Sequence, residues 1–137
     1  MKLAPWQEAV YSRAVRALAE GKLGHALLFT GPADLGAREV AEALALRLLC
    51  TQPRGDGHAC GECRGCRMAA AQSNGLVTTQ LHPDLQRIGL EPNEKGDKLR
   101  TEITVDQVRR LSQWFALTPQ LGGAQVALLG AWLDTRA

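Results

Sequence analysis

Four cysteines, Cys50, Cys60, Cys63 and Cys66, are all the cysteines of this chain and limit its fold more than any other feature. The last three form two overlapping C-x-x-C steps, and the first lies ten residues upstream. A C-x-x-C turn lets two thiolates converge on one ion, and Gly61 and Gly65 permit the tight backbone that this requires. Structural zinc takes four ligands and leaves no open position. The spacing therefore predicts a structural Zn²⁺ site with four thiolate ligands.

Other uses of the four thiols are open at this point. Disulfides need an oxidising compartment, and the N-terminus lacks the basic stretch and apolar run of a signal peptide. An iron–sulfur cluster also takes four thiolates. His58 lies two residues before Cys60 and is an alternative to Cys50 as a metal ligand. We expect zinc held by the four cysteines.

Length and charge exclude some classes of function. At 137 residues the chain can hold one modest domain, and 45% of its residues are hydrophobic. The net charge is only +2, too little to indicate nucleic-acid binding from bulk charge. Without an apolar run of membrane-spanning length, we expect a cytoplasmic protein with no membrane contact.

Helical spacing of apolar residues, together with helix-start signals, predicts four helices. Thr104 and Gln107 fit a capping box, and Pro5 suits a first helical turn. The predicted helices cover about Pro5 to Glu20, Gly36 to Cys50, Arg67 to Gln72, and a segment from Val105 through Val108, Leu111 and Phe115. In the first, we expect a buried stripe of Trp6, Val10, Ala14, Ala17 and Leu18.

Short apolar runs between these helices predict three strands. They are His25 to Thr30, Pro83 to Leu90, and Ala124 to Leu129. Strands that alternate with helices are typical of a parallel sheet with flanking helices. The fold class predicted from the sequence is therefore α/β.

A glycine-containing loop follows the first predicted strand and opens the next helix, which is the position of a phosphate-binding P-loop. Gly31 and Gly36 fall where G-x-x-x-x-G-K-[ST] requires glycine. Ala37 stands where that motif has the phosphate-binding lysine, and Arg38 where it has the magnesium-binding Ser or Thr. We therefore expect a degenerate loop with weak or no ATP binding and no hydrolysis. Its glycines can equally serve only to make a tight turn.

The order of motifs along the chain resembles the delta-prime family of bacterial DNA polymerase III clamp-loader subunits. The resemblance covers about residues 3 to 129, nearly the whole chain. It rests on an N-terminal Trp helix, the segment Gly24–Phe29 leading into the degenerate P-loop, the cysteine cluster, His82–Leu85, Val105–Arg109, Leu117–Gln120 and Gly122–Val126.

This resemblance implies an AAA+-type (P-loop NTPase-like) domain over residues 1–137, with a zinc-binding module inserted at about residues 50–72. It implies zinc ligands Cys50, Cys60, Cys63 and Cys66, and a non-catalytic role in a DNA polymerase III holoenzyme. The implied partners are the delta and gamma/tau subunits and, indirectly, the sliding clamp and primed DNA. Later motifs of the family, including a lid and a collar domain, do not follow Leu129, so the resemblance indicates a C-terminally truncated or frameshifted copy, or a fragment.

Two other functions compete with this interpretation. One is a P-loop ATPase, against which Ala37 and Arg38 argue. The other is a stand-alone zinc module that binds nucleic acid. The near-neutral charge and the lack of interleaved aromatic and basic residues around the cysteines argue against it.

Overall fold

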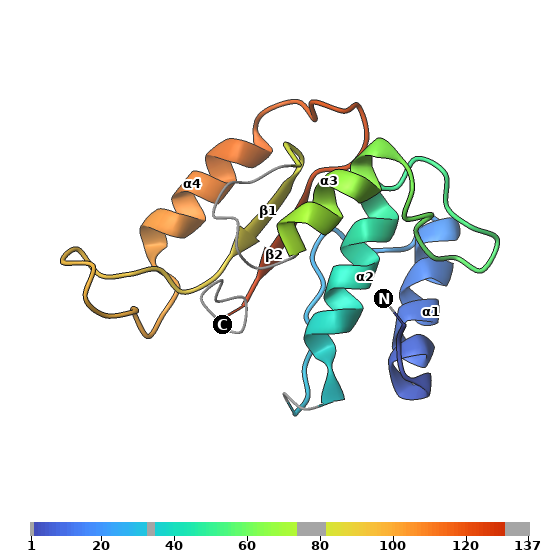
Figure 1. Ribbon diagram of the computed structural model, residues 1–137, viewed down its shortest axis with the longest axis horizontal. Coiled ribbons are helices and arrows are strands. Elements are labelled where there is room, and N and C mark those ends of the chain that lie inside the picture. The colour runs from blue at the N-terminus through green and yellow to red at the C-terminus, as the bar shows by residue number, and fades with distance from the viewer. Residues whose placement is uncertain (1, 33–34, 74–81, 131–137) are drawn as a thin grey trace.

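A computed structural model describes residues 2–32, 35–73 and 82–130 of the chain. Figure 1 shows two short strands between helix α4 on one side and helices α2 and α3 on the other. The elements, in order, are α1 (Pro5–Ala19), α2 (Ala37–Leu49), α3 (Arg64–Ser73), β1 (Leu85–Ile88), α4 (Val105–Phe115) and β2 (Val126–Leu129). Mixed α/β architecture is thus confirmed. In the described ranges, no helix is long and apolar enough to cross a membrane.

The helix starts follow from local hydrogen bonding. In α4, the hydroxyl of Thr104 accepts from the backbone N–H of Gln107, and the Gln107 side-chain oxygen accepts from the backbone N–H of Thr104. This confirms the predicted capping box. In α1, Pro5 stands in the first turn, and the Gln7 side chain accepts from the backbone N–H of Ala4 at 2.7 Å. Helix α3 begins at Arg64, earlier than predicted, so that it includes the last cysteine.

The predicted buried stripe of α1 is wrong in part. Trp6 is 59% exposed and Val10 is 43% exposed, whereas Tyr11 is buried. Helix α1 packs on α2 through a narrow contact around Tyr11, which replaces a full stripe. Ala14 packs at the edge of that contact.

Strands β1 and β2 pair in parallel, with Leu85 opposite Val126 and Ile88 opposite Leu129. The backbone N–H of Val126 donates to Asp84 at 2.9 Å, and that of Gly130 donates to Ile88 at 3.1 Å. The second and third predicted strands and their parallel arrangement are therefore confirmed, over shorter ranges than predicted.

The first predicted strand, His25 to Thr30, does not form. Within the described residues the sheet has two strands, and residues 25–30 have no strand pairing. A strand is defined by hydrogen bonds to a neighbouring backbone, and a groove of about 410 Å³ lies between residues 23–29 and β2. Phe29 is half-buried, while Leu27 and Leu28 are exposed. An apolar run alone could not reveal that the described residues supply no neighbouring strand for it.

The core lies on both sides of α2. One cluster joins α2 to the sheet and α3 through Ala45, Leu49, Ala69, Leu85 and Leu128. The other joins α2 to α1 through Tyr11, Val40 and Leu44. Phe29 packs against both clusters. Helix α2 is therefore the central element of the fold.

Two buried polar contacts fix the sheet in place. Arg87 of β1 donates to both carboxylate oxygens of Glu42 of α2, at 3.1 and 2.6 Å. The carboxylate of Asp84 accepts from the backbone N–H groups of Gln120 and Leu121 at 2.8 and 2.9 Å. Asp84 thereby holds the turn before β2 against the start of β1.

Candidate metal centre

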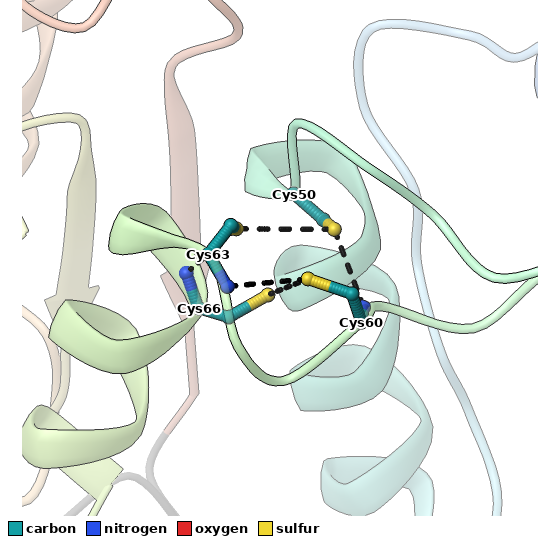
Figure 2. Close-up of side chains that lie close together, drawn as sticks. All are labelled: Cys50, Cys60, Cys63 and Cys66. Carbon is teal, nitrogen blue, oxygen red and sulfur yellow. Dashed lines mark hydrogen bonds between the residues drawn. The ribbon is translucent and has the colours of Figure 1, made fainter.

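The four cysteines come together where the end of α2 meets the start of α3. Cys50 caps the C-terminus of α2, Cys60 and Cys63 lie in the segment before α3, and Cys66 lies in the first turn of α3. Figure 2 shows their side chains converging between these two helix ends. Two of them, Cys50 and Cys66, are buried, and the other two are half-buried.

Distances between the sulfurs match a tetrahedral metal site. All four Sγ atoms lie within 4.8 Å of one another. The Cys60–Cys66 and Cys50–Cys63 sulfur pairs are both 4.0 Å apart. Zinc–sulfur bonds of about 2.3 Å in a tetrahedron place sulfurs about 3.8 Å apart. A disulfide bond is only about 2.05 Å long, so these four cysteines are free thiols arranged as a candidate metal site.

Backbone N–H groups support the sulfurs as negative ligands. Cys60 Sγ accepts from the N–H of Glu62 at 3.4 Å and of Cys63 at 3.2 Å, and these two bonds lower the pKa of Cys60. Cys50 Sγ accepts from the N–H of Cys60 at 3.3 Å. A thiolate is the form that binds metal, so donors aimed at sulfur favour metal binding.

Burial and hydrogen bonding act in opposite directions on the remaining thiols. Burial opposes ionisation of Cys63, yet hydrogen bonds from Thr51 and the backbone of Cys66 lower its pKa to about 6. At Cys66, burial dominates and raises the pKa to about 12. A thiol that is buried in this way gains a compensating positive charge when a cation replaces its proton.

Gly65 lets α3 approach α2 closely enough to close the site. A Cβ atom at this position would lie 2.8 Å from the backbone oxygen of Leu49. Gly61 has a φ of 76°, in the left-handed region that favours glycine. Both glycines therefore serve the tight backbone that the sequence predicted, Gly61 through its conformation and Gly65 through a close helix contact.

The loop between Cys50 and Cys60 is tied to α1. The Tyr11 hydroxyl donates to the backbone oxygen of Gly57 at 2.7 Å, and the Tyr11 ring stacks on that of His58 with centroids 4.4 Å apart. Burial raises the pKa of Tyr11 to about 12, which keeps its hydroxyl protonated as a donor. His58 Nε2 lies 2.9 Å from a carboxylate oxygen of Glu8. His58, the alternative ligand, thus lies outside the sulfur cluster and contacts α1.

Sequence reasoning missed Tyr11 and Glu8 as supports of this loop. No local motif links them to residues almost 50 positions away. One signal was present: Tyr11 is the only tyrosine in the chain, and it directly follows Val10 of the predicted stripe.

The degenerate phosphate loop lies at the N-terminal end of α2, whereas the cysteine cluster lies at its C-terminal end. Gly36 caps the N-terminus of α2 with a φ of 81°, Ala37 begins the helix, and Arg38 is exposed. Gly31 has a φ of 145°. Side chains of α1 hold the carbonyls at the helix start: Trp6 Nε1 donates to Leu35 at 3.1 Å, and Gln7 Nε2 donates to Gly36 at 3.0 Å. The loop therefore connects α1 to α2.

Comparisons with known proteins identify the family. The family model described as DNA polymerase III, delta subunit, matches residues 6–132. The chain is 41% identical over 125 residues to DNA polymerase III subunit delta' of Pseudomonas aeruginosa, covering 91% of this chain and 33% of that protein. It is 32% identical over 124 residues to subunit delta' of Haemophilus influenzae, covering 90% of this chain and 33% of that protein.

The chain thus spans about a third of the length of these relatives, and the matched part is their N-terminal part. The two relatives bear the same name, and the match covers the helices, the strands and all four cysteines described above. The chain therefore belongs to the delta-prime family of DNA polymerase III subunits.

Proposed function

We propose that this chain is the N-terminal part of a delta-prime-type clamp-loader subunit, which acts in the cytoplasm as a non-catalytic structural component. In this role it contacts the delta and gamma/tau subunits and supports loading of the sliding clamp on primed DNA. The observation that carries the proposal is the family match over residues 6–132. The parallel sheet, with helices on both sides, supports an AAA+-type domain over residues 1–137.

A structural zinc ion held by Cys50, Cys60, Cys63 and Cys66 is part of the proposal. The donor set is four thiols that converge to within 4.8 Å, with backbone donors on their sulfurs. When bound, zinc cross-links the C-terminus of α2 to the N-terminus of α3 and offers no open position for a substrate. It would shape the insert at about residues 50–72.

The phosphate loop supports a non-catalytic role. Ala37 lacks the ammonium group, and Arg38 lacks the hydroxyl, that P-loop enzymes use for phosphates and magnesium. Trp6 and Gln7 donate hydrogen bonds to the backbone oxygens of Leu35 and Gly36, and these bonds attach the start of α2 to α1. We therefore propose that ATP binds weakly or not at all.

A chimera tests this function directly. The matching N-terminal part of the Pseudomonas aeruginosa delta' subunit is replaced by residues 1–137 of this chain, and clamp loading is reconstituted with that organism's delta, gamma/tau and clamp. We expect the chimera to support loading within about tenfold of the parent rate. A chimera that melts cooperatively and holds zinc, but neither joins the complex nor supports loading, would contradict the proposal. An unaltered parent subunit and a reaction without delta' serve as controls.

A further inference from the structure

Helix α1 is attached to the rest of the fold at few points. Among its residues Tyr11 alone is buried, whereas Trp6 is 59% exposed and Val10 is 43% exposed. A helix of 15 residues is only marginally stable by itself in water. The order of α1 therefore depends on the contacts around Tyr11 and on the hydrogen bonds of its first turn.

The loop between the first two cysteines covers Tyr11. The Tyr11 hydroxyl donates to the backbone oxygen of Gly57 at 2.7 Å, and its ring stacks on that of His58 at an interplanar angle of 16°. Glu8, also on α1, lies 2.9 Å from the same imidazole. Figure 1 shows this segment, between α2 and α3, passing beside α1. A buried hydroxyl without a partner is unfavourable, so the buried position of Tyr11 depends on the loop.

The candidate metal centre fixes both ends of that loop. Cys50 lies at one end, and Cys60 lies two residues after His58 at the other. Residues 51–59 form neither helix nor strand, although Arg54 donates to the carbonyl of His58 at 2.8 Å within a local turn. A metal ion bound by both end cysteines closes the loop and reduces its conformational freedom. Metal binding therefore favours the loop conformation that covers Tyr11.

The first turn of α1 is bonded to the degenerate phosphate loop. Trp6 Nε1 donates to the carbonyl of Leu35 at 3.1 Å, and Gln7 Nε2 donates to that of Gly36 at 3.0 Å. Gly36 leaves room for the Gln7 side chain, which a Cβ atom at that position would overlap. Gln7 and Tyr11 lie about one helical turn apart, so a shift of α1 at Tyr11 moves both donors away from these carbonyls.

We propose that metal binding at the four cysteines stabilises the docked position of α1 through Tyr11, and that α1 in turn orders the phosphate loop at Leu35 and Gly36. The metal centre and the phosphate loop lie at opposite ends of α2, and α1 contacts residues next to both. Helix α1, docked or loosely attached, is the two-state element that coupling between distant sites requires. The inference rests on the proposed zinc site and concerns neither clamp loading nor ATP.

Hydrogen exchange followed by NMR tests this coupling. The 137-residue chain is compared with one zinc bound and after a chelator has removed the zinc under reducing conditions. We expect removal to speed exchange of the Trp6 indole N–H, and of amides in the middle of α1 such as that of Val15, by about tenfold. The amides of Val126 and Gly130, which donate to β1, should change by less than about twofold.

Two results of this comparison would overturn the proposal. One is unchanged exchange of the Trp6 indole N–H and the α1 amides on zinc removal. The other is equal acceleration at Trp6, Val126 and Gly130, because zinc would then hold the whole fold and not α1 in particular.

Tyr11→Phe tests the coupling from the other end. The variant keeps the aromatic ring but removes the hydrogen bond to Gly57. Because coupling between two sites is reciprocal, loosening α1 should weaken zinc retention and speed zinc release to a chelator by about fivefold. The variant should still contain one zinc per molecule, and zinc should slow exchange at Trp6 less than in the wild type. Zinc release at the wild-type rate would contradict the coupling.

Two glutamate variants provide a matched comparison that spares the core. The side chains of Glu8 and Glu20 are exposed to a similar extent, 41% and 51%, but Glu8 faces His58 whereas Glu20 faces Lys22. Glu8→Ala should speed zinc release by about threefold, and Glu20→Ala should leave the rate unchanged. Equal rates in the two variants would contradict the proposal.

These measurements also separate the inference from the proposed function. A chain that binds no zinc would contradict both. A chain that binds one zinc without any change in Trp6 exchange would overturn only the inference. Failure of clamp loading by the chimera, with Trp6 protected by zinc, would contradict only the proposed function.

Discussion

At the scale of single residues, a few side chains decide what this fold can do. Ala37 and Arg38 remove the charge and the hydroxyl that a phosphate loop needs. Gln7 and Trp6 then attach α1 to carbonyls at the start of α2. Gly36, with a φ of 81°, caps the start of α2 at a place where two side chains of α1 are hydrogen-bonded, so these residues hold two helices together.

The chain should therefore show no ATP hydrolysis above a blank without protein. The double substitution Ala37→Lys and Arg38→Thr restores the missing groups, so any gain should be in nucleotide affinity and not in turnover. A coupled phosphate-release assay measures turnover, and fluorescence with a labelled ATP measures binding. Turnover that copurifies with the chain and disappears in Gly36→Val would contradict this expectation.

Buried and exposed ion pairs give a second prediction at this scale. Glu42→Gln removes the carboxylate that faces Arg87 in a pair whose side chains are 8% and 11% exposed. Loss of one partner of a buried pair costs about 3–5 kcal/mol of the free energy of unfolding. Glu91→Gln removes the partner of Arg110 in an exposed pair and should cost less than about 1 kcal/mol. Urea unfolding of both variants measures the difference, and equal costs would show that Glu42 does not hold β1 to α2.

At the scale of elements, the metal centre depends on how closely α3 approaches α2. The contact is made at Gly65, where a Cβ would lie 2.8 Å from the Leu49 carbonyl. Alanine is ordinarily better than glycine inside a helix, by about 1 kcal/mol. Here the close contact outweighs that propensity, since a backbone oxygen cannot move aside as a flexible side chain can.

Gly65→Ala should accordingly destabilise the chain by about 1–3 kcal/mol and weaken metal retention against a chelator. Gly55→Ala is the control, because a Cβ there has no neighbour within 4 Å. Thermal unfolding and zinc release to a colorimetric chelator measure the two effects. A Gly65→Ala protein as stable as wild type would show that the helices can move apart without cost.

Elements with strong local signals could be predicted from the sequence, and those that depend on distant partners could not. The capping box at Thr104 and the proline at Pro5 act within a few residues, and both helices form as expected. The run His25 to Thr30 has the composition of a strand, but strand formation needs a neighbouring backbone. Trp6 and Val10 have helical spacing, but the surface that would cover them is not supplied by the described residues.

At the scale of the whole molecule, two groups of elements pack against α2, one on each side. Helix α1 packs on one side of α2, and α3 with the sheet packs on the other. The cysteines lie where α2 ends and α3 begins, and the loop between them returns to α1 through Tyr11. A metal ion at this place would therefore connect both groups.

The predicted site illustrates the same difference between local and distant information. Four thiols with C-x-x-C spacing could be assigned to one centre from the sequence, because the short steps fix two of the separations. The convergence of Cys50 depends on where α2 ends, and the helical spacing of apolar residues predicted an end at about Cys50. The stacking of Tyr11 on His58 depends on tertiary packing and could not be predicted from either segment alone.

Metal analysis of the purified, reduced chain tests the central claim, a zinc-bound delta-prime-type domain, most directly. We predict one zinc per molecule and no iron, because four sulfurs within 4.8 Å of one another leave room for a single tetrahedral ion and not for the several irons of an iron–sulfur cluster. Cys63→Ser should lower the zinc content at least tenfold, whereas His58→Gln should leave it unchanged. A chain that contains iron, or that melts cooperatively with no metal after purification under reducing conditions, would contradict the account.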